Sequence, residues 1–315
     1  MLKTCLLITV YKNRNQRLIN WLESQDSYIR NKIDIFLLIQ NNDPNKDEYN
    51  SLVNHIDLLY CDAKNIPEKR YFGYHWAIDN GYDVLMWSDD DIKPYAYYID
   101  YKTRTKSNKS FKQLSIPIDN LYEKLIELVK SYPDGGLYSA SRFGFLGLLC
   151  TKEQNKPNVN KNIYPIQLLA INLNNTKDKV DYPNDNQECF EDVSFMIDCL
   201  VNGLCIYGLP NYSFNAVKYN FNNKLSNVFD DIYKYNRFLI NNYVKFGGDL
   251  TLSNKGKLVP KMKYSKYYKE RKYPLPSGQK FDEELRNICC KGKVTNQTVD
   301  EVIEYLKHKN QKEKS

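Results

Sequence analysis

The sequence predicts an α/β fold, in which a mostly parallel, Rossmann-like sheet flanked by helices is followed by a basic C-terminal extension. In the first half of the chain, short apolar runs alternate with helical patterns, and such alternation is typical of a parallel sheet. A chain of 315 residues is long enough for one large domain and an appendage. We therefore expect a core domain over residues 1–215 and a partly flexible Tyr- and Lys-rich region over residues 216–315.

Four short apolar runs are the expected strands of the first half. They are CLLITV (5–10), DIFLLIQ (34–40), IDLLYC (56–61) and DVLMWS (83–88). The spacing of apolar residues predicts a helix between the first two runs. A second helix is predicted over residues 67–80, because Pro67 and Glu68 suit a first helical turn and Asn80-Gly81 suits a helix end. This helix leads directly into the fourth strand.

The later elements are less regular. After Pro94 we expect a Tyr- and Lys-rich loop, then an amphipathic helix, IDNLYEKLIELVKSY, over residues 118–132. In ECFEDVSFMIDCLVNG (188–203), apolar residues at helical spacing predict a helix that Gly203 ends, and LCIYGLP (204–210) should return to the sheet. The last ~30 residues predict one or two short helices and a Lys-rich tail.

Three consecutive aspartates, Asp89, Asp90 and Asp91, follow the fourth strand. Adjacent carboxylates repel one another, which destabilises the folded state unless a cation, hydrogen-bond donors or water offset the repulsion. Mg2+ and Mn2+ prefer oxygen ligands, commonly one or two carboxylates together with substrate phosphates. Because open α/β sheets bind ligands at the carboxyl ends of their strands, the position favours a Mn2+ or Mg2+ site. The alternative is a solvated acidic turn that caps the next element.

Motifs and composition argue against several classes of protein. No GxGxxG follows the first strand and no GxxxxGK[ST] occurs, which argues against typical NAD enzymes and Walker-type ATPases. No apolar run approaches the ~20 residues that cross a bilayer, so we expect a cytoplasmic protein with no membrane partner. The 8 cysteines lack CxxC spacing and predict reduced, mostly buried residues. What remains is a nucleotide site whose phosphates are bound by a metal ion and basic side chains.

The charge is divided unevenly along the chain. Residues 1–214 carry 24 Lys and Arg against 27 Asp and Glu, whereas residues 215–315 carry 21 against 11. Residues 255–280 alone hold nine Lys and Arg interleaved with tyrosines, the residue types that neutralise phosphates and stack on bases. An anionic partner such as DNA is therefore expected for the C-terminal region. The alternative is a solvated Lys-rich loop that reflects an AT-rich genome.

Four segments together resemble a known enzyme family. They are LLITVYKNRN, LLIQNND, PEKRYFGYHWAIDNGYDVLMWSDDDIKP and ECFEDVSFMIDCLVNG, and they cover roughly residues 1–215. Their order is similar to that of the GT-A glycosyltransferases, metal-dependent enzymes that use nucleotide-sugar donors. The block from PEKR to DDD, with YPIQLLAINL and the later ED pair, is most similar to the phage TET-associated glycosyltransferases, which add sugars to hydroxymethylated DNA bases. The Arg-Trp pair that often follows ED in inverting members is absent, which leaves the acceptor class open.

The resemblance implies roles for individual residues. Asp89 and Asp91 would hold Mn2+ or Mg2+ on the phosphates of the donor, most simply a UDP-sugar. Asp192 would be the general base, with Glu191 as the alternate, although both residues also suit the first turn of a helix, where negative charge is favourable. The donor-binding residues implied are Thr9, Tyr11, Arg14, Asn42, Asp43, Lys69, Arg70, Asp89 and Asp90. The acceptor-binding residues expected are Arg142, Gln167, Lys261, Lys263, Lys266 and Lys269.

The resemblance and the basic C-terminal region thus predict a metal-dependent glycosyltransferase that acts on hydroxymethylated pyrimidines in phage DNA. Two alternatives stay open. The first is a cytoplasmic glycosyltransferase for a bacterial surface glycan. The second is a non-catalytic nucleic-acid-binding protein that retains a degenerate nucleotide fold.

Overall fold

The computed structural model describes most of the chain in two compact units. Unit 1 comprises Met1–Asn184 and Leu204–Lys218, and unit 2 comprises Asp185–Gly203 and Tyr219–Ser315. The described residues are 2–10, 32–44, 46–52, 56–100, 112–142, 156–159, 167–183, 191–216, 232–246, 250–253, 258–260 and 282–312. The predicted helix between the first two strands lies outside these ranges.

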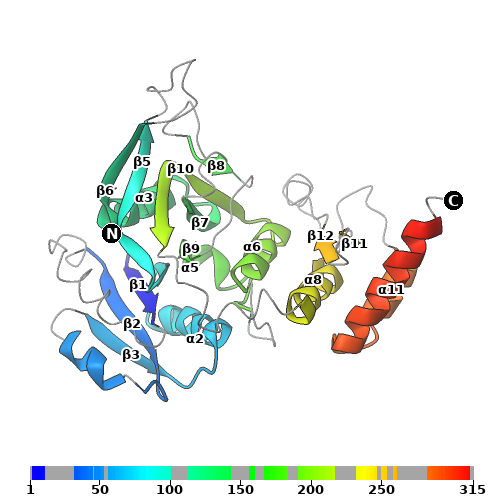
Figure 1. Cartoon of the computed structure of the whole chain (residues 1–315). Coiled ribbons are helices and arrows are strands. Elements are labelled where there is room, and N and C mark those ends of the chain that lie inside the picture. The colour runs from blue at the N-terminus through cyan, green and yellow to red at the C-terminus, as the bar shows by residue number, and fades with distance from the viewer. Residues whose placement is uncertain are drawn as a thin grey trace. The chain divides into compact units, whose positions relative to one another are not determined.

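Unit 1 is built on one mixed sheet (Figure 1). Its strands follow the order β3-β2-β1-β4-β9-β7-β10-β5-β6, and β8 pairs with β10. The strands are β1 (Thr4–Thr9), β2 (Asp34–Gln40), β3 (Asp57–Cys61), β4 (Val84–Asp89), β5 (Ile92–Asp100), β6 (Lys112–Pro117), β7 (Gly135–Arg142), β8 (Asn158–Val159), β9 (Leu168–Asn172) and β10 (Cys205–Ala216). The half formed by β3, β2, β1 and β4 is parallel throughout, which confirms the predicted Rossmann-like α/β class.

The second half of the sheet is mixed. β9 runs antiparallel to both β4 and β7, and its register places Leu168 opposite Ser88. The start of β9 therefore meets the carboxyl end of β4. β5 pairs antiparallel with β6 and β10, so the loop predicted after Pro94 is wrong over residues 95–100 and 112–117, while residues 101–111 lie outside the described residues. Aromatic residues favour strands through cross-strand contacts, as between Tyr98 and Tyr212, whose ring centroids are 5.0 Å apart.

Among the described residues of unit 1, two long helices cover the sheet, accompanied by short α5 (Leu173–Thr176) and the 3₁₀ turn η1 (Lys46–Leu52). α2 (Ile66–Asp79) packs against β1 and β2, and α3 (Ile118–Ser131) packs against β5, β7 and β10. Asn65 caps α2, because its side chain accepts a hydrogen bond from the Glu68 backbone amide at 2.8 Å. This cap begins the helix just before Lys69 and Arg70, both of which are buried.

Gly73 lets α2 approach the sheet closely. A Cβ atom at this position would lie 2.4 Å from Trp87 Cη2 and 2.7 Å from Leu7 Cδ1, and both neighbours are fully buried. In Gly73→Ala the gain in helix propensity is ~1 kcal/mol, whereas overpacking a filled core costs ~1–3 kcal/mol. We therefore expect a lower midpoint in thermal unfolding, and an unchanged midpoint for Asp79→Ala at the exposed end of the same helix. A raised midpoint in Gly73→Ala would contradict the close packing.

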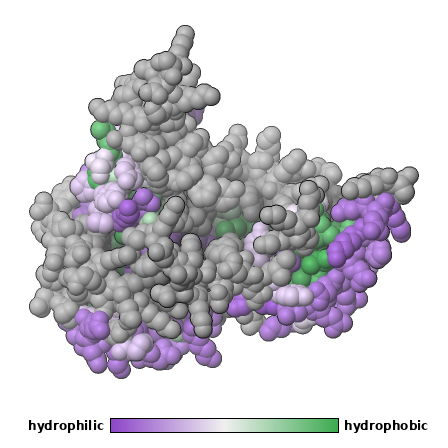
Figure 2. Space-filling view, viewed as in Figure 1, coloured by the Kyte–Doolittle hydropathy of each residue, from purple (hydrophilic) through white to green (hydrophobic). Residues whose placement is uncertain are grey.

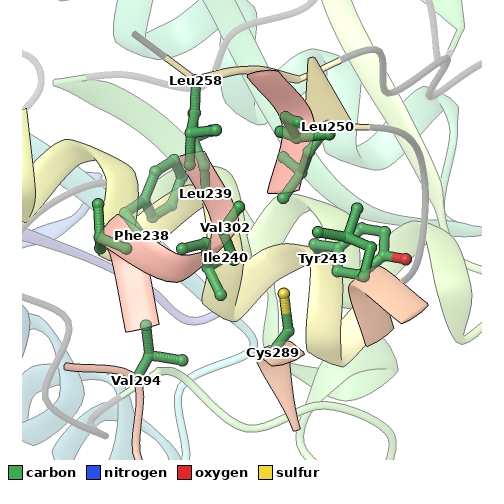
Figure 3. Packing of buried hydrophobic residues seen from close by; sticks show 12 residues of the cluster. Phe238, Leu239, Ile240, Tyr243, Leu250, Leu258, Cys289, Val294 and Val302 are labelled. Atoms are coloured by element: carbon green, nitrogen blue, oxygen red, sulfur yellow. The ribbon is translucent and has the colours of Figure 1, made fainter. Parts of the chain in front are cut away.

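Unit 2 has its own hydrophobic core. Its elements are α6 (Glu191–Val201), α8 (Ile232–Phe246), β11 (Leu250–Leu252), β12 (Leu258–Pro260), α10 (Glu283–Cys289) and α11 (Asn296–Lys312). Figure 3 shows side chains from α8, from both strands and from α10 and α11 packed together, with Ile240 and Val302 fully buried. In Figure 2 the visible surface of α11 is hydrophilic beside a hydrophobic strip, as expected for a helix that buries Val299, Val302 and Leu306.

Polar contacts of Asp282 connect the two C-terminal helices, α10 and α11. Asp282 caps α10 by accepting from the Leu285 backbone amide at 3.1 Å. Its carboxylate also accepts from the Tyr305 hydroxyl at 2.8 Å and from Lys309 Nζ at 2.6 Å, both on α11. Tyr305 in turn has a raised pKa, first because burial disfavours its charged form and then because Asp282 accepts from the neutral hydroxyl.

Several other expectations can be compared with the described residues. α6 is helical as predicted. It belongs to unit 2, together with the C-terminal helices, and not to unit 1, which contains the sheet. Cys5, Cys61, Cys199, Cys205 and Cys289 are buried and form no disulfide bond, and Cys290 is exposed and likewise forms none. Among the described helices, none is long and apolar enough to span a bilayer.

Candidate active site

The carboxyl ends of β1 and β4 bring two predicted residues side by side. The parallel register places Thr9 opposite Asp89. The Thr9 hydroxyl lies 3.2 Å from Asp89 Oδ1 and 3.4 Å from the Ser88 carbonyl oxygen. Both residues therefore belong to one site at the edge of the sheet where open α/β folds bind ligands.

Arg70 reaches the same carboxylate from the first turns of α2. Its Nη2 atom lies 2.9 Å from Asp89 Oδ1, and the side chains are 4% and 24% exposed respectively. A guanidinium this deeply buried gains from a carboxylate partner, because an isolated buried charge is costly. The ion pair fixes the Asp89 carboxylate at the end of β4.

Asp91 is held from a different element. Gln167, the residue before β9, donates from Nε2 to Asp91 Oδ1 at 3.2 Å. Its carbonyl oxygen accepts from the Asp89 backbone amide at 3.0 Å. The two outer aspartates of the triplet are therefore both contacted by one residue that lies 76 positions after Asp91.

Lys69 is a buried cation behind this edge. Its Nζ donates to the Val10 carbonyl oxygen at 2.8 Å, at the point where the chain leaves β1. Burial lowers the pKa of Lys69, while the nearby Asp43 and Asp90 carboxylates oppose that shift. Asp43 and Asp90 are themselves buried, so two carboxylates near the ends of β2 and β4 partly offset the cost of burying the ammonium group.

The residues present fit a hard divalent cation that takes part of its coordination from a substrate. Both described bonds to the Asp89 carboxylate end on Oδ1, and Asp89 and Asp91 are each partly exposed. Within the described residues no three His, Cys, Asp or Glu side chains gather into a complete metal site. One or two carboxylates with phosphates and water are the usual ligands of Mg2+ at nucleotide sites, so two aspartates suffice.

Comparison with solved structures identifies the fold. The sequence matches no protein-family model and no curated protein. The structure is similar to residues 1–349 of TarS from S. aureus, with 12% identity, a TM-score of 0.50, and coverage of 97% of this chain and 83% of that one. The chain has a GT-A-like fold.

Two further similar structures contain bound nucleotide-sugars. The same TarS fragment in complex with UDP-GlcNAc matches at 12% identity, a TM-score of 0.49, and coverage of 97% of this chain and 84% of that one. A mannosyltransferase from Pyrobaculum calidifontis in complex with GDP-Man and Mn2+ matches at 12% identity and a TM-score of 0.49, over 76% of this chain and 62% of that one.

The remaining predicted residues belong to unit 2, to the turn after β2 or to segments outside the described residues. Glu191 and Asp192 begin α6 in unit 2, and both are buried. Asp192 Oδ1 accepts from the Val193 backbone amide at 2.8 Å, a contact typical of a helix N-terminus. Asn42 is exposed in the turn after β2. Tyr11, Arg14, Lys261, Lys263, Lys266, Lys269 and the side chain of Arg142 fall outside the described set.

The contact between Gln167 and Asp91 was missed by the sequence analysis, which assigned Gln167 to the acceptor. No local pattern predicts it, because it depends on β9 pairing antiparallel with β4. The hydrogen bond from Lys69 to the Val10 carbonyl oxygen was not predicted either, because every residue has a main-chain carbonyl and the sequence does not show which one is used.

Proposed function

We propose that this chain is a metal-dependent glycosyltransferase that uses a nucleotide-sugar donor. The observation that carries the proposal is the arrangement at the end of β4. There Asp89 contacts Thr9 and Arg70, and Asp91 contacts Gln167, on a GT-A-like fold. Two partly exposed carboxylates at the ligand-binding edge of an α/β sheet suit a donor diphosphate bound through a cation.

Asp89 and Asp91 would hold the Mn2+ or Mg2+ ion, which when bound neutralises the charge of the departing nucleoside diphosphate. Arg70 orients Asp89 and keeps a positive charge behind the phosphates. Lys69 fixes the end of β1, which carries Thr9, and the expected donor residues Tyr11 and Arg14 follow in the sequence. Asn42 and Asp43 would contact the base or ribose from the end of β2.

The acceptor hydroxyl needs a group that removes its proton, and we assign this role to Asp192, with Glu191 as the alternate. A carboxylate is suited to the task when it is held in a desolvated place, and both of these side chains are buried. Glu191 and Asp192 belong to unit 2, whereas the donor residues are assigned to unit 1.

We further propose that the acceptor is a hydroxymethylated pyrimidine in DNA. The excess of basic residues in the C-terminal region supports an anionic polymer as acceptor. Arg142, the last residue of β7, would be an acceptor-binding residue of unit 1. A surface glycan is the alternative acceptor, and a degenerate, non-catalytic nucleic-acid-binding protein is the alternative function.

Mass spectrometry of nucleosides tests donor and acceptor together. The protein is incubated with Mn2+, a set of donors that includes UDP-GlcNAc, and DNA containing hydroxymethylcytosine or hydroxymethyluracil. The proposal predicts a nucleoside heavier by one sugar residue. Release of nucleoside diphosphate without a modified nucleoside would instead favour a glycan acceptor, and binding of DNA without any donor turnover would favour the non-catalytic alternative.

The lysines of the C-terminal region provide a direct test of DNA binding. We expect replacement of Lys261, Lys263, Lys266 and Lys269 by Gln to weaken DNA binding and flatten its salt dependence, because each lost phosphate contact removes roughly 0.7 to 0.9 from the log-log slope. Fluorescence anisotropy at several salt concentrations measures both quantities. The matched control replaces four exposed lysines of unit 1 by Gln, at positions Lys64, Lys130, Lys177 and Lys179.

The two quadruple variants have the same change in net charge, so a shared loss of affinity would indicate a general charge effect. Equal affinity and slope in the C-terminal variant and the wild-type protein would falsify the DNA assignment. Donor hydrolysis without DNA should survive in both variants, because the donor residues are assigned to unit 1.

A further inference from the structure

Gln167 has a backbone conformation that side-chain-bearing residues seldom adopt. Its φ angle is 65°, in the left-handed region, and Asn211 is the other described non-glycine residue with positive φ. The left-handed region costs a residue with a Cβ atom roughly 1–2 kcal/mol. Such strain persists only where the surroundings enforce it, and it is concentrated at functional sites.

The contacts of Gln167 show what this conformation achieves. Its carbonyl oxygen accepts from the Asp89 backbone amide at 3.0 Å, and its Nε2 atom donates to Asp91 Oδ1 at 3.2 Å and approaches Oδ2 at 3.5 Å. Main chain and side chain thus contact the first and the last aspartate of the triplet. In an ordinary strand conformation, the carbonyl oxygen and the side chain of Gln167 would point in other directions than those that reach Asp89 and Asp91.

Stability alone does not account for this arrangement. Gln167 Oε1 is buried and accepts no hydrogen bond from the described residues, and leaving a buried polar atom unsatisfied costs about 1–3 kcal/mol. The position therefore combines backbone strain with an unsatisfied acceptor. Glycine would avoid both costs while keeping the carbonyl bond to Asp89.

We propose that Gln167 is a positioning residue that fixes the orientation of the Asp91 carboxylate for metal binding. The role rests on the proposed function, because it assumes that Asp89 and Asp91 hold the divalent cation. A neutral amide is suited to it, since it donates to Asp91 without adding a positive charge that would compete with the cation. Residues that orient ligands in this way typically contribute about 10- to 100-fold to metal affinity.

Mn2+ binding in the presence of UDP, measured by electron paramagnetic resonance, tests the role without a turnover assay. Gln167→Met keeps the length of the side chain and removes the amide, and Gln167→Gly removes the side chain and relieves the backbone. Both variants should bind Mn2+ about 10- to 100-fold more weakly than the wild-type protein. Gln167→Gly should do so with an unchanged or raised unfolding midpoint, which a merely structural role would not produce.

Gln297 provides the matched control. Its Nε2 also donates to a carboxylate oxygen, Glu301 Oε1 at 3.0 Å, but on the exposed surface of α11. Gln297→Met should leave Mn2+ affinity unchanged.

The outcomes separate the positioning role from the proposed function. Wild-type Mn2+ affinity in Gln167→Met and Gln167→Gly would overturn the positioning role and leave the proposed function standing. If Mn2+ binding is weakened only in a variant that also has a lower unfolding midpoint, the positioning role is overturned as well. Failure of the wild-type protein to bind Mn2+ with UDP would overturn both.

Discussion

Asp91→Asn should lower metal-dependent turnover by about 100- to 1,000-fold, since a catalytic metal contributes several kcal/mol and each ~1.4 kcal/mol is tenfold in rate. The amide has nearly the volume of the carboxylate, but it is a much weaker ligand for Mn2+. It can still accept the contact from Gln167 Nε2 through its own oxygen. The unfolding midpoint should therefore stay close to that of the wild-type protein.

Turnover measured across a range of Mn2+ concentrations checks this expectation. Asp79→Asn, at an exposed position of α2, makes the same chemical change away from the site and should keep full turnover. Wild-type turnover of Asp91→Asn at limiting Mn2+ would show that Asp91 is not a metal ligand.

Asp192→Asn should lower kcat by about 100-fold or more, the range typical of losing a general base. The substitution distinguishes the base from a structural role at the start of α6. Asparagine retains an oxygen that can accept from the Val193 backbone amide, and it loses only the ~0.3 to 1 kcal/mol that negative charge contributes at a helix N-terminus. A purely structural Asp192 would therefore tolerate the change with full activity.

Donor affinity provides the second measurement for this variant. UDP binding should change little, because the donor residues are assigned to unit 1 and Asp192 lies in unit 2. An effect confined to UDP affinity would remove Asp192 from the role of base. Glu191→Gln, measured in parallel, shows which of the two carboxylates the reaction requires.

The parallel half of the sheet could be predicted because its signals are local. Continuous apolar runs mark β1, β2, β3 and β4, and Asn65, Pro67 and Glu68 mark the start of α2. Parallel strands bind ligands at their carboxyl ends, so both Thr9 and Asp89 could be predicted at that edge of the sheet, whereas their direct contact depends on the pairing of β1 with β4.

The mixed half depends on pairings between distant segments. Nothing within residues 92–100 indicates that they join β10, and the Tyr- and Lys-rich composition suggested a loop. The same limit applies to Gln167, whose strained backbone and contact with Asp91 arise only once β9 pairs with β4. The grouping of α6 with the C-terminal core likewise results from packing against α8, not from any feature of its own sequence.

Release of nucleoside diphosphate tests the proposed activity most directly. The wild-type protein is incubated with hydroxymethylated DNA and a panel of donors that includes UDP-GlcNAc, UDP-glucose and GDP-mannose, first with Mn2+ and then with excess EDTA. The proposed activity predicts release from at least one donor with Mn2+, and its loss both in EDTA and in the Asp91→Asn variant. Release that is equal with Mn2+ and with EDTA, or no release from any donor, would contradict a metal-dependent transferase built on Asp89 and Asp91.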